Sequence, residues 1–189
     1  MGRGPGLTPL PPSPSGGGLG WGHPRRHFLA ALLALSVPSL RAQARLERLP
    51  PGASLPAWQA LDLDGKPVAI PAPGKPTIVN FWASWCEPCR AEMPTLQQVA
   101  DFYGPEKLLV LAINFKEPAA RALQFAKTTG VTLPVLLDLD GKAARAWGVK
   151  VFPTTLMMDV AGRPRLRVKG EVDWTGPAAE KLIAGLLKP

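Results

Sequence analysis

The feature that most constrains this chain is a pair of cysteines, Cys86 and Cys89, that are its only two cysteines. The residues before the pair, 77–82, are apolar, β-branched or aromatic apart from one Asn, which predicts a buried strand. After the pair, large and small apolar residues recur at helical spacing at Met93, Leu96, Ala100 and Tyr103. The two cysteines are therefore expected where a strand ends and a helix begins.

This position favours a reactive thiol at Cys86. The N-terminus of a helix carries partial positive charge and free N–H groups, and both stabilise a thiolate. Because only the thiolate attacks disulfides, the location of the pair predicts thiol–disulfide exchange.

Other uses of a Cys-x-x-Cys pair fit this sequence less well. A zinc site normally needs four Cys or His ligands, and the only histidines, His23 and His27, lie in a segment that we expect to be removed. Covalent haem attachment requires His directly after the second cysteine, where this chain has Arg90. A purely structural disulfide is the plain alternative, although it would close a loop too short to stabilise the fold much.

The N-terminal segment is expected to lie outside the folded domain. Residues 1–24 are rich in Gly, Pro and Ser, which predicts disorder or a misassigned start of translation. The pair Arg25-Arg26, the apolar run at 30–37 and a small-x-small sequence ending at Ala44 resemble a twin-arginine export signal. We expect cleavage after Ala44 and a periplasmic or otherwise extracytoplasmic protein. The alternative is an uncleaved, membrane-tethered signal, although the apolar run is shorter than the roughly 20 residues that span a bilayer.

Part of the basic character of the chain belongs to this leader. The formal net charge is +8, and removal of residues 1–44, with four arginines and no acidic residue, lowers it to +4. The remaining basic cluster, 163–169, alternates Arg or Lys with Pro, Leu and Val, which predicts the solvated face of a strand. No nucleic-acid-binding motif accompanies it, so we expect no nucleic-acid partner.

The chain after the leader, about 145 residues, is long enough for one domain with its own core. We expect a Pro-rich linker at 45–54 and one folded domain at 55–189, which starts with a hairpin at 58–70. Further strands are predicted at 108–114, 133–137, 154–159 and 165–169, and helices at 118–129, at 142–147 and after Thr175, which is expected to cap the last helix. This alternation predicts an α/β fold with a mixed sheet covered on both faces.

Two segments resemble a known family. Residues 81–94, Phe-Trp-Ala-Ser-Trp-Cys-Glu-Pro-Cys-Arg-Ala-Glu-Met-Pro, are similar to the active-site block of the TlpA/ResA-like family of thioredoxin-fold proteins. Residues 151–155, Val-Phe-Pro-Thr-Thr, resemble the cis-proline loop of that family. The resemblance covers about residues 55–187. It implies a thioredoxin-like fold, in which the 58–70 hairpin is an N-terminal extension and residues 118–137 are an inserted helix and strand.

The same resemblance implies an exported thiol–disulfide oxidoreductase. Such a protein would reduce protein disulfides in cytochrome c maturation or in other assembly of extracytoplasmic proteins, with no cofactor besides a redox-active Cys86–Cys89 disulfide. Cys86 is expected to be the nucleophile and Cys89 the resolving thiol. The backbone beside a cis Pro153 is expected to pair with an extended substrate. The expected catalytic residues are Cys86, Cys89, Glu92 and Pro153, and the expected substrate contacts are Trp85, Glu87, Pro88, Phe152 and Thr154.

Two acidic residues are expected to make the cysteine pair reducing. Glu92 follows Cys89 by three residues and matches a Glu that the family carries below its active site. A partly buried carboxylate there disfavours the thiolate and can shuttle its proton. Glu87, between the cysteines, acts in the same direction. Asn80 stands where thioredoxins carry a buried Asp, and because Asn cannot accept a proton, proton handling is expected to depend on Glu92.

Three other functions remain open. The first is a disulfide oxidase or isomerase, which the two acidic residues disfavour, and the second is a peroxidase of the broader fold, which would need differently placed residues. The third is a copper-binding assembly factor, which would need a distal His that the chain after residue 44 lacks; Met157 and Met158 are expected in the core. The expected partners are protein thiols and disulfides and a membrane thiol relay as electron donor. Neither a metal nor a tightly bound small molecule is expected.

Overall fold

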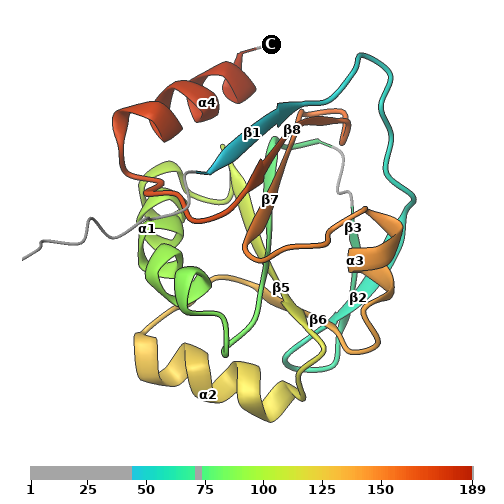
Figure 1. Cartoon of the computed structure of the whole chain (residues 1–189), viewed down its shortest axis with the longest axis vertical. Helices are drawn as coiled ribbons and strands as arrows, with labels where there is room; N and C mark the ends of the chain where they lie inside the picture. Colours follow the sequence, from blue (N-terminus) through green and yellow to red (C-terminus); the bar gives the residue numbers. More distant parts are fainter. Residues whose placement is uncertain (1–43, 71–73, 189) are drawn as a thin grey trace, which may run out of the picture. The chain divides into compact units, whose positions relative to one another are not determined.

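The computed structural model describes residues 44–70 and 74–188, so the predicted leader lies outside the described residues except for Ala44. The strands are β1 (Arg45–Arg48), β2 (Trp58–Asp62), β3 (Pro67–Ile70), β4 (Thr77–Trp82), β5 (Leu109–Phe115), β6 (Val135–Asp138), β7 (Thr154–Met158) and β8 (Pro164–Lys169). The helices are α1 (Glu87–Tyr103), α2 (Ala119–Thr129), α3 (Lys142–Ala146) and α4 (Pro177–Leu187) (Figure 1). Among these described helices, we find none with the length and apolar character needed to cross a membrane.

The described strands form one mixed sheet in the order β1-β8-β7-β4-β5-β6-β2-β3. The β4–β5 and β5–β6 pairs are parallel, and the other pairs are antiparallel. Every residue of β4 is buried, as expected for a central strand covered on both faces. Because β4 ends at Trp82, the cysteine pair emerges from the middle of the sheet and not from its margin.

Alternate residues of β4 face two separate apolar clusters. Ile78 and Trp82 pack in a cluster with residues of α1, α2 and α4, whereas Val79 and Phe81 pack in a second cluster with residues of α3. Figure 1 shows this division, with α1, α2 and α4 on one side of the sheet and α3 on the other. The mixed, doubly covered sheet predicted from the sequence is confirmed.

Helix α1 begins where the sequence predicts a strand-to-helix junction. Cys86 is its N-cap residue and Pro88 lies in its first turn, where a missing N–H group costs no hydrogen bond. Cys89, Glu92, Met93, Leu96 and Val99 form its buried face. Glu92 is the one acidic residue on this otherwise apolar buried face, so its carboxyl group needs polar partners within the fold.

The predicted linker at 45–54 begins with a strand instead. Residues of β1 pair antiparallel with β8, from Arg45 opposite Lys169 to Arg48 opposite Leu166. Glu47 lies 2.9 Å from Lys169 and 3.6 Å from Arg167 in ion pairs. The prolines that follow β1 suggested a linker, whereas the strand forms because β8, more than 100 residues away, offers an edge to pair with.

The sequence predicts that the basic residues of the cluster at 163–169 form a solvated strand face. In the structure only part of this cluster is solvated. Pro164, Leu166 and Val168 are buried as expected, but Arg167 is largely covered as well. Its guanidinium donates a hydrogen bond of 2.8 Å to the carbonyl of Trp147 and pairs with Glu47. Arg167 and Lys169 are thus engaged within the fold, whereas Arg163 and Arg165 remain exposed.

The remaining elements agree with the predictions except at one cap. The 58–70 hairpin is confirmed as β2 and β3, and α2 and β6 occupy the predicted insertion. The cap of α4 was predicted wrongly, because Gly176 and not Thr175 is its N-cap residue. The Thr175 hydroxyl donates instead to Asp173 Oδ1 at 2.6 Å, and Gly176 has no side chain that could accept a hydrogen bond from the first turn.

Candidate active site

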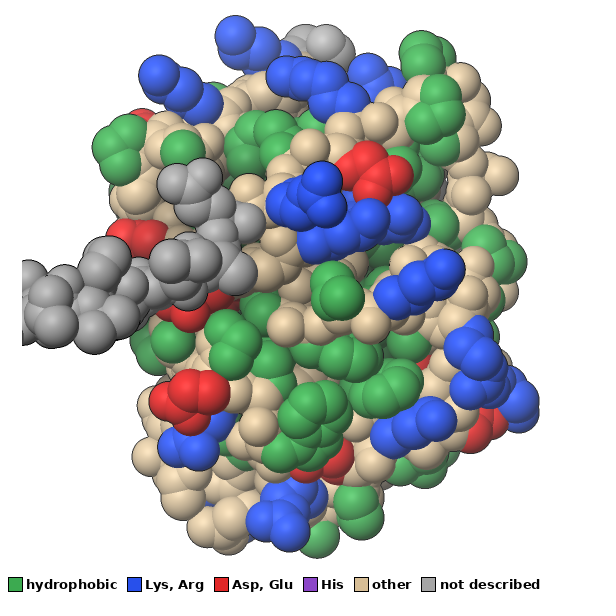
Figure 2. Space-filling view, in the orientation of Figure 1, with side chains coloured by type: hydrophobic (Ala, Val, Ile, Leu, Met, Phe, Trp, Pro, Cys, Tyr) green, Lys and Arg blue, Asp and Glu red, His purple; other side chains and the backbone are tan. Residues whose placement is uncertain are grey.

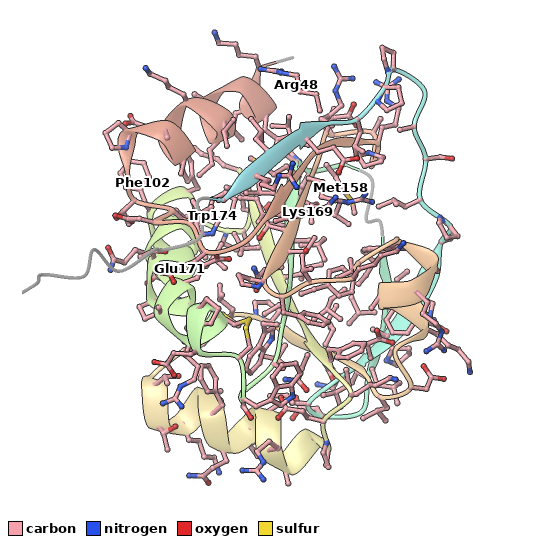
Figure 3. The ribbon with its side chains drawn as sticks, in the orientation of Figure 1. Arg48, Phe102, Met158, Lys169, Glu171 and Trp174 are labelled. Carbon is pink, nitrogen blue, oxygen red and sulfur yellow. A yellow bond between two sulfur atoms is a disulfide. The ribbon has the colours of Figure 1, made fainter. Side chains whose placement is uncertain are left out.

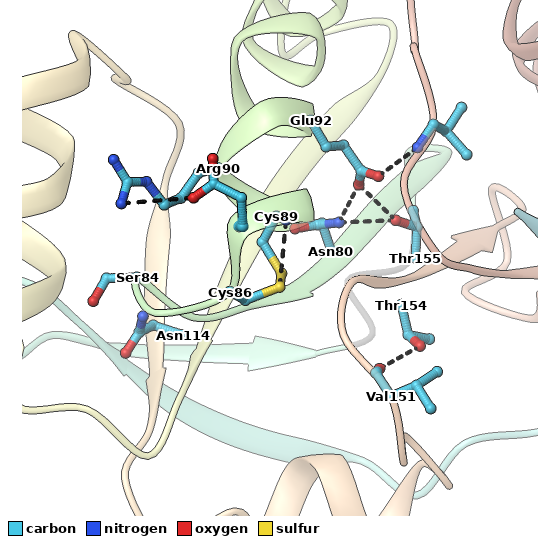
Figure 4. Close-up of a disulfide and its surroundings, with 12 residues drawn as sticks. Asn80, Ser84, Cys86, Cys89, Arg90, Glu92, Asn114, Val151, Thr154 and Thr155 are labelled. Atoms are coloured by element: carbon cyan, nitrogen blue, oxygen red, sulfur yellow. Dashed lines mark hydrogen bonds and ion pairs between the residues drawn. A yellow bond between two sulfur atoms is a disulfide. The ribbon is translucent and has the colours of Figure 1, made fainter. Parts of the chain in front are cut away.

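Cys86 and Cys89 form a disulfide at the N-terminus of α1 (Figure 4). Cys86 is 6% exposed and Cys89 is 1% exposed, so Cys86 is the more accessible of the two. The backbone N–H of Cys89 donates a hydrogen bond of 3.3 Å to Cys86 Sγ. An N–H group at a helix N-terminus stabilises negative charge on the sulfur that it faces.

The carboxyl group of Glu92 is buried beneath the disulfide and has hydrogen-bond partners from three other segments. Glu92 Oε1 accepts from Asn80 Nδ2 of β4 at 2.7 Å and from Thr155 Oγ1 of β7 at 3.5 Å. Glu92 Oε2 accepts from the backbone N–H of Val172 at 2.8 Å. Asn80 Nδ2 also donates to Thr155 Oγ1 at 2.9 Å, and Figure 4 shows Asn80 between the cysteine pair and Glu92.

Burial raises the pKa of Glu92 to about 7, although the hydrogen bond from the backbone N–H of Val172 acts in the opposite direction. Burial disfavours the charged form of a carboxylic acid because water no longer solvates it. Glu92 therefore changes its protonation state near neutral pH, one helical turn away from Cys89.

The cis-proline loop lies at the start of β7, beside the cysteine pair. The Phe152–Pro153 peptide bond is cis, as the family resemblance implied. The N–H of Gly170 donates to the carbonyl of Pro153 at 2.9 Å, which holds the loop against the end of β8. Thr154, expected to contact substrate, is fully buried, and its hydroxyl donates to the carbonyl of Val151 at 2.8 Å. Its hydroxyl therefore closes the loop from inside, and a contact between Thr154 and substrate stays a prediction.

An aromatic wall runs from Trp85 through Phe152 to Phe115. The ring centroids of Trp85 and Phe152 are 6.0 Å apart in an edge-on arrangement, and those of Phe152 and Phe115 are 4.6 Å apart. Lys116 Nζ lies 5.3 Å from the centre of the Phe115 ring. Trp85 is 64% exposed and borders Cys86 in sequence, so the wall presents apolar surface next to the accessible cysteine. Phe115 and Lys116 were not expected at the site from the sequence, because no local signal places the end of β5 near residue 152.

A second buried carboxylate, which was not expected from the sequence, holds the turn before Cys86. Glu117 Oε2 accepts from the backbone N–H of Ser84 at 2.7 Å and from Asn114 Nδ2 at 2.8 Å, while Oε1 accepts from the Ser84 hydroxyl at 2.5 Å. Glu117 is buried although it follows a strand in a polar stretch. The only signal in the sequence that could have indicated this role is the position of an acidic residue just after the end of a predicted strand.

The remaining predicted site residues lie on the outer surface of the α1 N-terminus. Glu87 is exposed and lies 3.9 Å from Arg90, a distance at which a solvated ion pair contributes little. Pro88 is half-buried between the cysteines. Because Glu87 is solvated, its charge affects the cysteine sulfurs less than the buried charge of Glu92 does.

The raised pKa of Glu92 predicts a pH-dependent stability of the oxidised protein. The folded pKa of about 7 exceeds the ordinary value of 4.5. Below about pH 4.5 the carboxyl group is protonated in both the folded and the unfolded state, and its burial costs the least folding free energy. The unfolding free energy then falls as pH rises from about 4.5 through about 7. Glu92→Gln removes this titration. Between about pH 5 and about pH 8 the wild type should lose about 2–3 kcal/mol more unfolding free energy than Glu92→Gln, as measured by urea titration. Glu87→Gln serves as the control, and identical pH profiles for Glu92→Gln and the wild type would contradict the prediction.

The hydrogen bonds of Glu117 predict a large effect of a small substitution. Glu117→Gln replaces one acceptor oxygen by an NH₂ group that must face an existing donor, which should lower the unfolding free energy by about 1–3 kcal/mol. Ser84→Ala removes only the hydroxyl and should cost about 1 kcal/mol or less. The two effects should be non-additive in a double-mutant cycle measured by urea unfolding. A Glu117→Gln variant as stable as Ser84→Ala would rule out this role of the carboxylate.

Comparison with known proteins agrees with this geometry. Residues 51–165 match the AhpC/TSA family. A thiol-disulfide oxidoreductase ResA of Geobacillus thermodenitrificans is 32% identical over 120 residues, which are 63% of this chain and 69% of the relative. The thiol-disulfide oxidoreductase ResA of Bacillus subtilis is 30% identical over 147 residues, covering 76% of this chain and 79% of that protein.

A solved structure shares the fold. A crystal structure assigned as the thiol:disulfide interchange protein DsbE of Chlorobium tepidum superposes with a TM-score of 0.67 and 28% identity, covering 76% of this chain and 100% of that one. The arrangement of sheet and helices described above is therefore a thioredoxin-like fold. This chain belongs to the AhpC/TSA family and is a thiol–disulfide oxidoreductase of the ResA and DsbE type.

Proposed function

We propose that this protein is an exported reductant of protein disulfides and that Cys86 and Cys89 carry the exchange. The observation that most supports this direction is the buried Glu92, whose pKa is raised to about 7 beneath the cysteine pair. When Glu92 is ionised, its negative charge disfavours a thiolate on the neighbouring cysteines. A dithiol whose thiolate is poorly stabilised gives up its electrons more readily, which makes it a better reductant.

The reaction transfers two electrons from the dithiol to the substrate. The Cys86 thiolate attacks one sulfur of the substrate disulfide, so that a mixed disulfide forms and the other substrate sulfur leaves as a thiolate. The Cys89 thiolate then attacks Cys86 Sγ, which closes the Cys86–Cys89 disulfide and releases the second substrate sulfur. The greater exposure of Cys86 and the burial of Cys89 support this order of events.

Glu92 has a separate role in the proton balance of the second step. Cys89 is a thiol before it attacks, and its proton must leave for the thiolate to form. A carboxylate with a pKa near 7 is matched to this task at neutral pH. Asn80 bonds to Glu92 and orients it, but Asn80 cannot itself accept the proton.

The substrate is a protein segment that lies across the aromatic wall and the cis-proline loop. Trp85 and Phe152 offer apolar contact beside Cys86, and Phe115 and Lys116 extend this surface. The backbone beside Pro153 pairs with the extended substrate, with Glu87 and Pro88 at the other margin of the site. Thr154 supports the loop from inside.

Export and the electron donor follow from the leader and from the compartment. The twin-arginine-like segment before residue 45 directs the folded protein out of the cytoplasm, either as a cleaved protein or tethered by its signal. In an oxidising compartment the Cys86–Cys89 disulfide must be reduced again after each reaction, and a membrane thiol relay supplies the electrons. The proposed tasks are cytochrome c maturation or other assembly of extracytoplasmic proteins.

One observation favours the opposite direction, in which the protein oxidises thiols. Cys86 caps the N-terminus of α1 and accepts a hydrogen bond from the Cys89 N–H, and both features stabilise a Cys86 thiolate. A stabilised thiolate makes a pair more oxidising. The reduction potential shows whether this effect or the Glu92 charge is larger.

The proposed direction predicts the reduction potential of the Cys86–Cys89 pair. Equilibration with glutathione at neutral pH should give about −250 mV or lower, in the range of thioredoxin. Glu92→Gln should raise the potential by roughly 30 mV and lower the Cys86 pKa, whereas the exposed Glu87→Gln should change both less. A wild-type value near about −120 mV would instead identify a disulfide-forming oxidant.

The proposed order of attack predicts which variant traps substrate. Cys89→Ser leaves the mixed disulfide on Cys86 without its resolving thiol, so disulfide-linked complexes should accumulate in the exported fraction. The matched control is Cys86→Ser, which lacks the accessible thiol and should trap little. Non-reducing electrophoresis followed by mass spectrometry of the linked proteins measures both. Equal trapping by the two variants, or none by Cys89→Ser, would contradict the scheme.

A further inference from the structure

A groove lies between α4, the end of β1 and the turn that joins β7 to β8. It has a volume of about 790 Å³, in the usual range for ligand-binding pockets of roughly 300–1,000 Å³. Its lining residues come from segments far apart in sequence, from Arg48 to Lys188. None of them belongs to the cysteine site or to the aromatic wall.

The described residues that line this groove are strongly cationic. Six carry positive charge: Arg48, Lys107, Arg163, Arg165, Lys181 and Lys188. The single acidic lining residue, Asp159, is already paired, at 3.1 Å from Arg163 Nε and 3.6 Å from Arg165. Figure 2 shows Lys and Arg side chains gathered on the upper part of this face, where Figure 1 places α4, β1 and β8. The exposed half of the basic cluster at 163–169 therefore belongs to a larger set of cations.

The base of the groove is apolar. Leu166 and Leu186 are buried, and Leu49, Leu182 and Leu187 are half-buried around them. The cationic side chains that line the same groove are exposed. An occupant must therefore bring both negative charge and apolar side chains, and it must reach into a concavity.

The groove lies at the far end of the β7–β8 hairpin from the cysteine site. Pro153 and Gly170, which bond to each other beside the disulfide, lie at one end of this hairpin. Asp159 and Arg163 lie at its other end, beyond the five residues of β7, which span roughly 17 Å. Figure 3 shows Arg48 close to α4 and away from the disulfide, which is drawn in yellow. A partner in the groove would therefore leave Cys86 free to react.

We propose that this groove binds an acidic and partly apolar segment of a protein partner. Charge complementarity between the six cations and the carboxylates of the segment supplies steering and orientation. Contact of its apolar side chains with the leucines of the groove supplies the remaining affinity. A bilayer surface fits less well, because membrane-binding faces project their apolar residues outward, whereas here Leu166 and Leu186 lie at the base of a concavity.

The test uses the full-length chain and a fluorescent synthetic peptide of alternating Glu and Leu. Fluorescence anisotropy should detect binding at about 0.01 M salt and a weaker affinity at about 0.15 M, because the Debye length falls from about 30 Å to about 8 Å. The variant Lys107→Glu/Lys181→Glu reverses two exposed cations of the groove. The matched control, Arg121→Glu/Lys127→Glu, makes the same change of net charge on the exposed face of α2.

The groove variant should bind the peptide at least about tenfold more weakly than the wild type, and the α2 control about as well as the wild type. The reduction potential should be unchanged in both variants, which separates this proposal from the proposed reductant function. Equal weakening by both variants would show only a general charge effect and would overturn the proposal, as would the absence of binding at low salt. Sedimentation with phosphatidylglycerol but not phosphatidylcholine vesicles, lost in the groove variant while the peptide fails to bind, would assign the groove to lipid instead.

Discussion

The burial of the Glu92 carboxyl group is the constraint on which the site depends. Glu92 lies on the inner face of α1 and bonds to Asn80 of β4, Thr155 of β7 and the backbone of Val172 after β8. These are the elements that place the two cysteines and the cis-proline loop next to each other. Burial of the Glu92 carboxyl group is unfavourable, and the hydrogen bonds that join these elements offset part of the cost. The same burial raises the pKa of Glu92.

A second carboxylate supports the site from the opposite side. Glu117, after β5, holds Ser84 in the turn between β4 and Cys86, while Glu92 lies beneath the helix that follows. Hydrogen bonds from Ser84 to Glu117 therefore anchor the turn that carries Trp85 and Cys86, while the bonds of Glu92 fix helix α1 against β4 and β7. The exposed part of the site, the aromatic wall, rests on this anchored turn, so that rigid elements position the groups that meet a substrate.

Local patterns in the sequence predicted much of this architecture. The apolar run of β4, the helical spacing after Cys89 and the hairpin at 58–70 each depend on neighbouring residues, and each was found. The cis bond before Pro153 and the inserted α2 and β6 were predicted through the family resemblance. The strand β1 was missed because it depends on distant residues, since it forms on the edge of β8. The wrong cap of α4 is a local error, because the Thr175 hydroxyl bonds to Asp173, two residues before it.

The sequence by itself determined the chemistry available to this protein. Its only two cysteines stand at a strand-to-helix junction, with an acidic residue one helical turn beyond them. Only the tertiary structure decided the surroundings of these groups. Burial of Glu92, the bond from Glu117 to Ser84, the packing of Phe115 on Phe152 and the gathering of cations beside α4 all join residues that lie far apart in the chain or depend on such neighbours. The physical reason is that periodicity and spacing reveal which face of an element is apolar, whereas solvation and hydrogen bonding depend on which other elements cover that face.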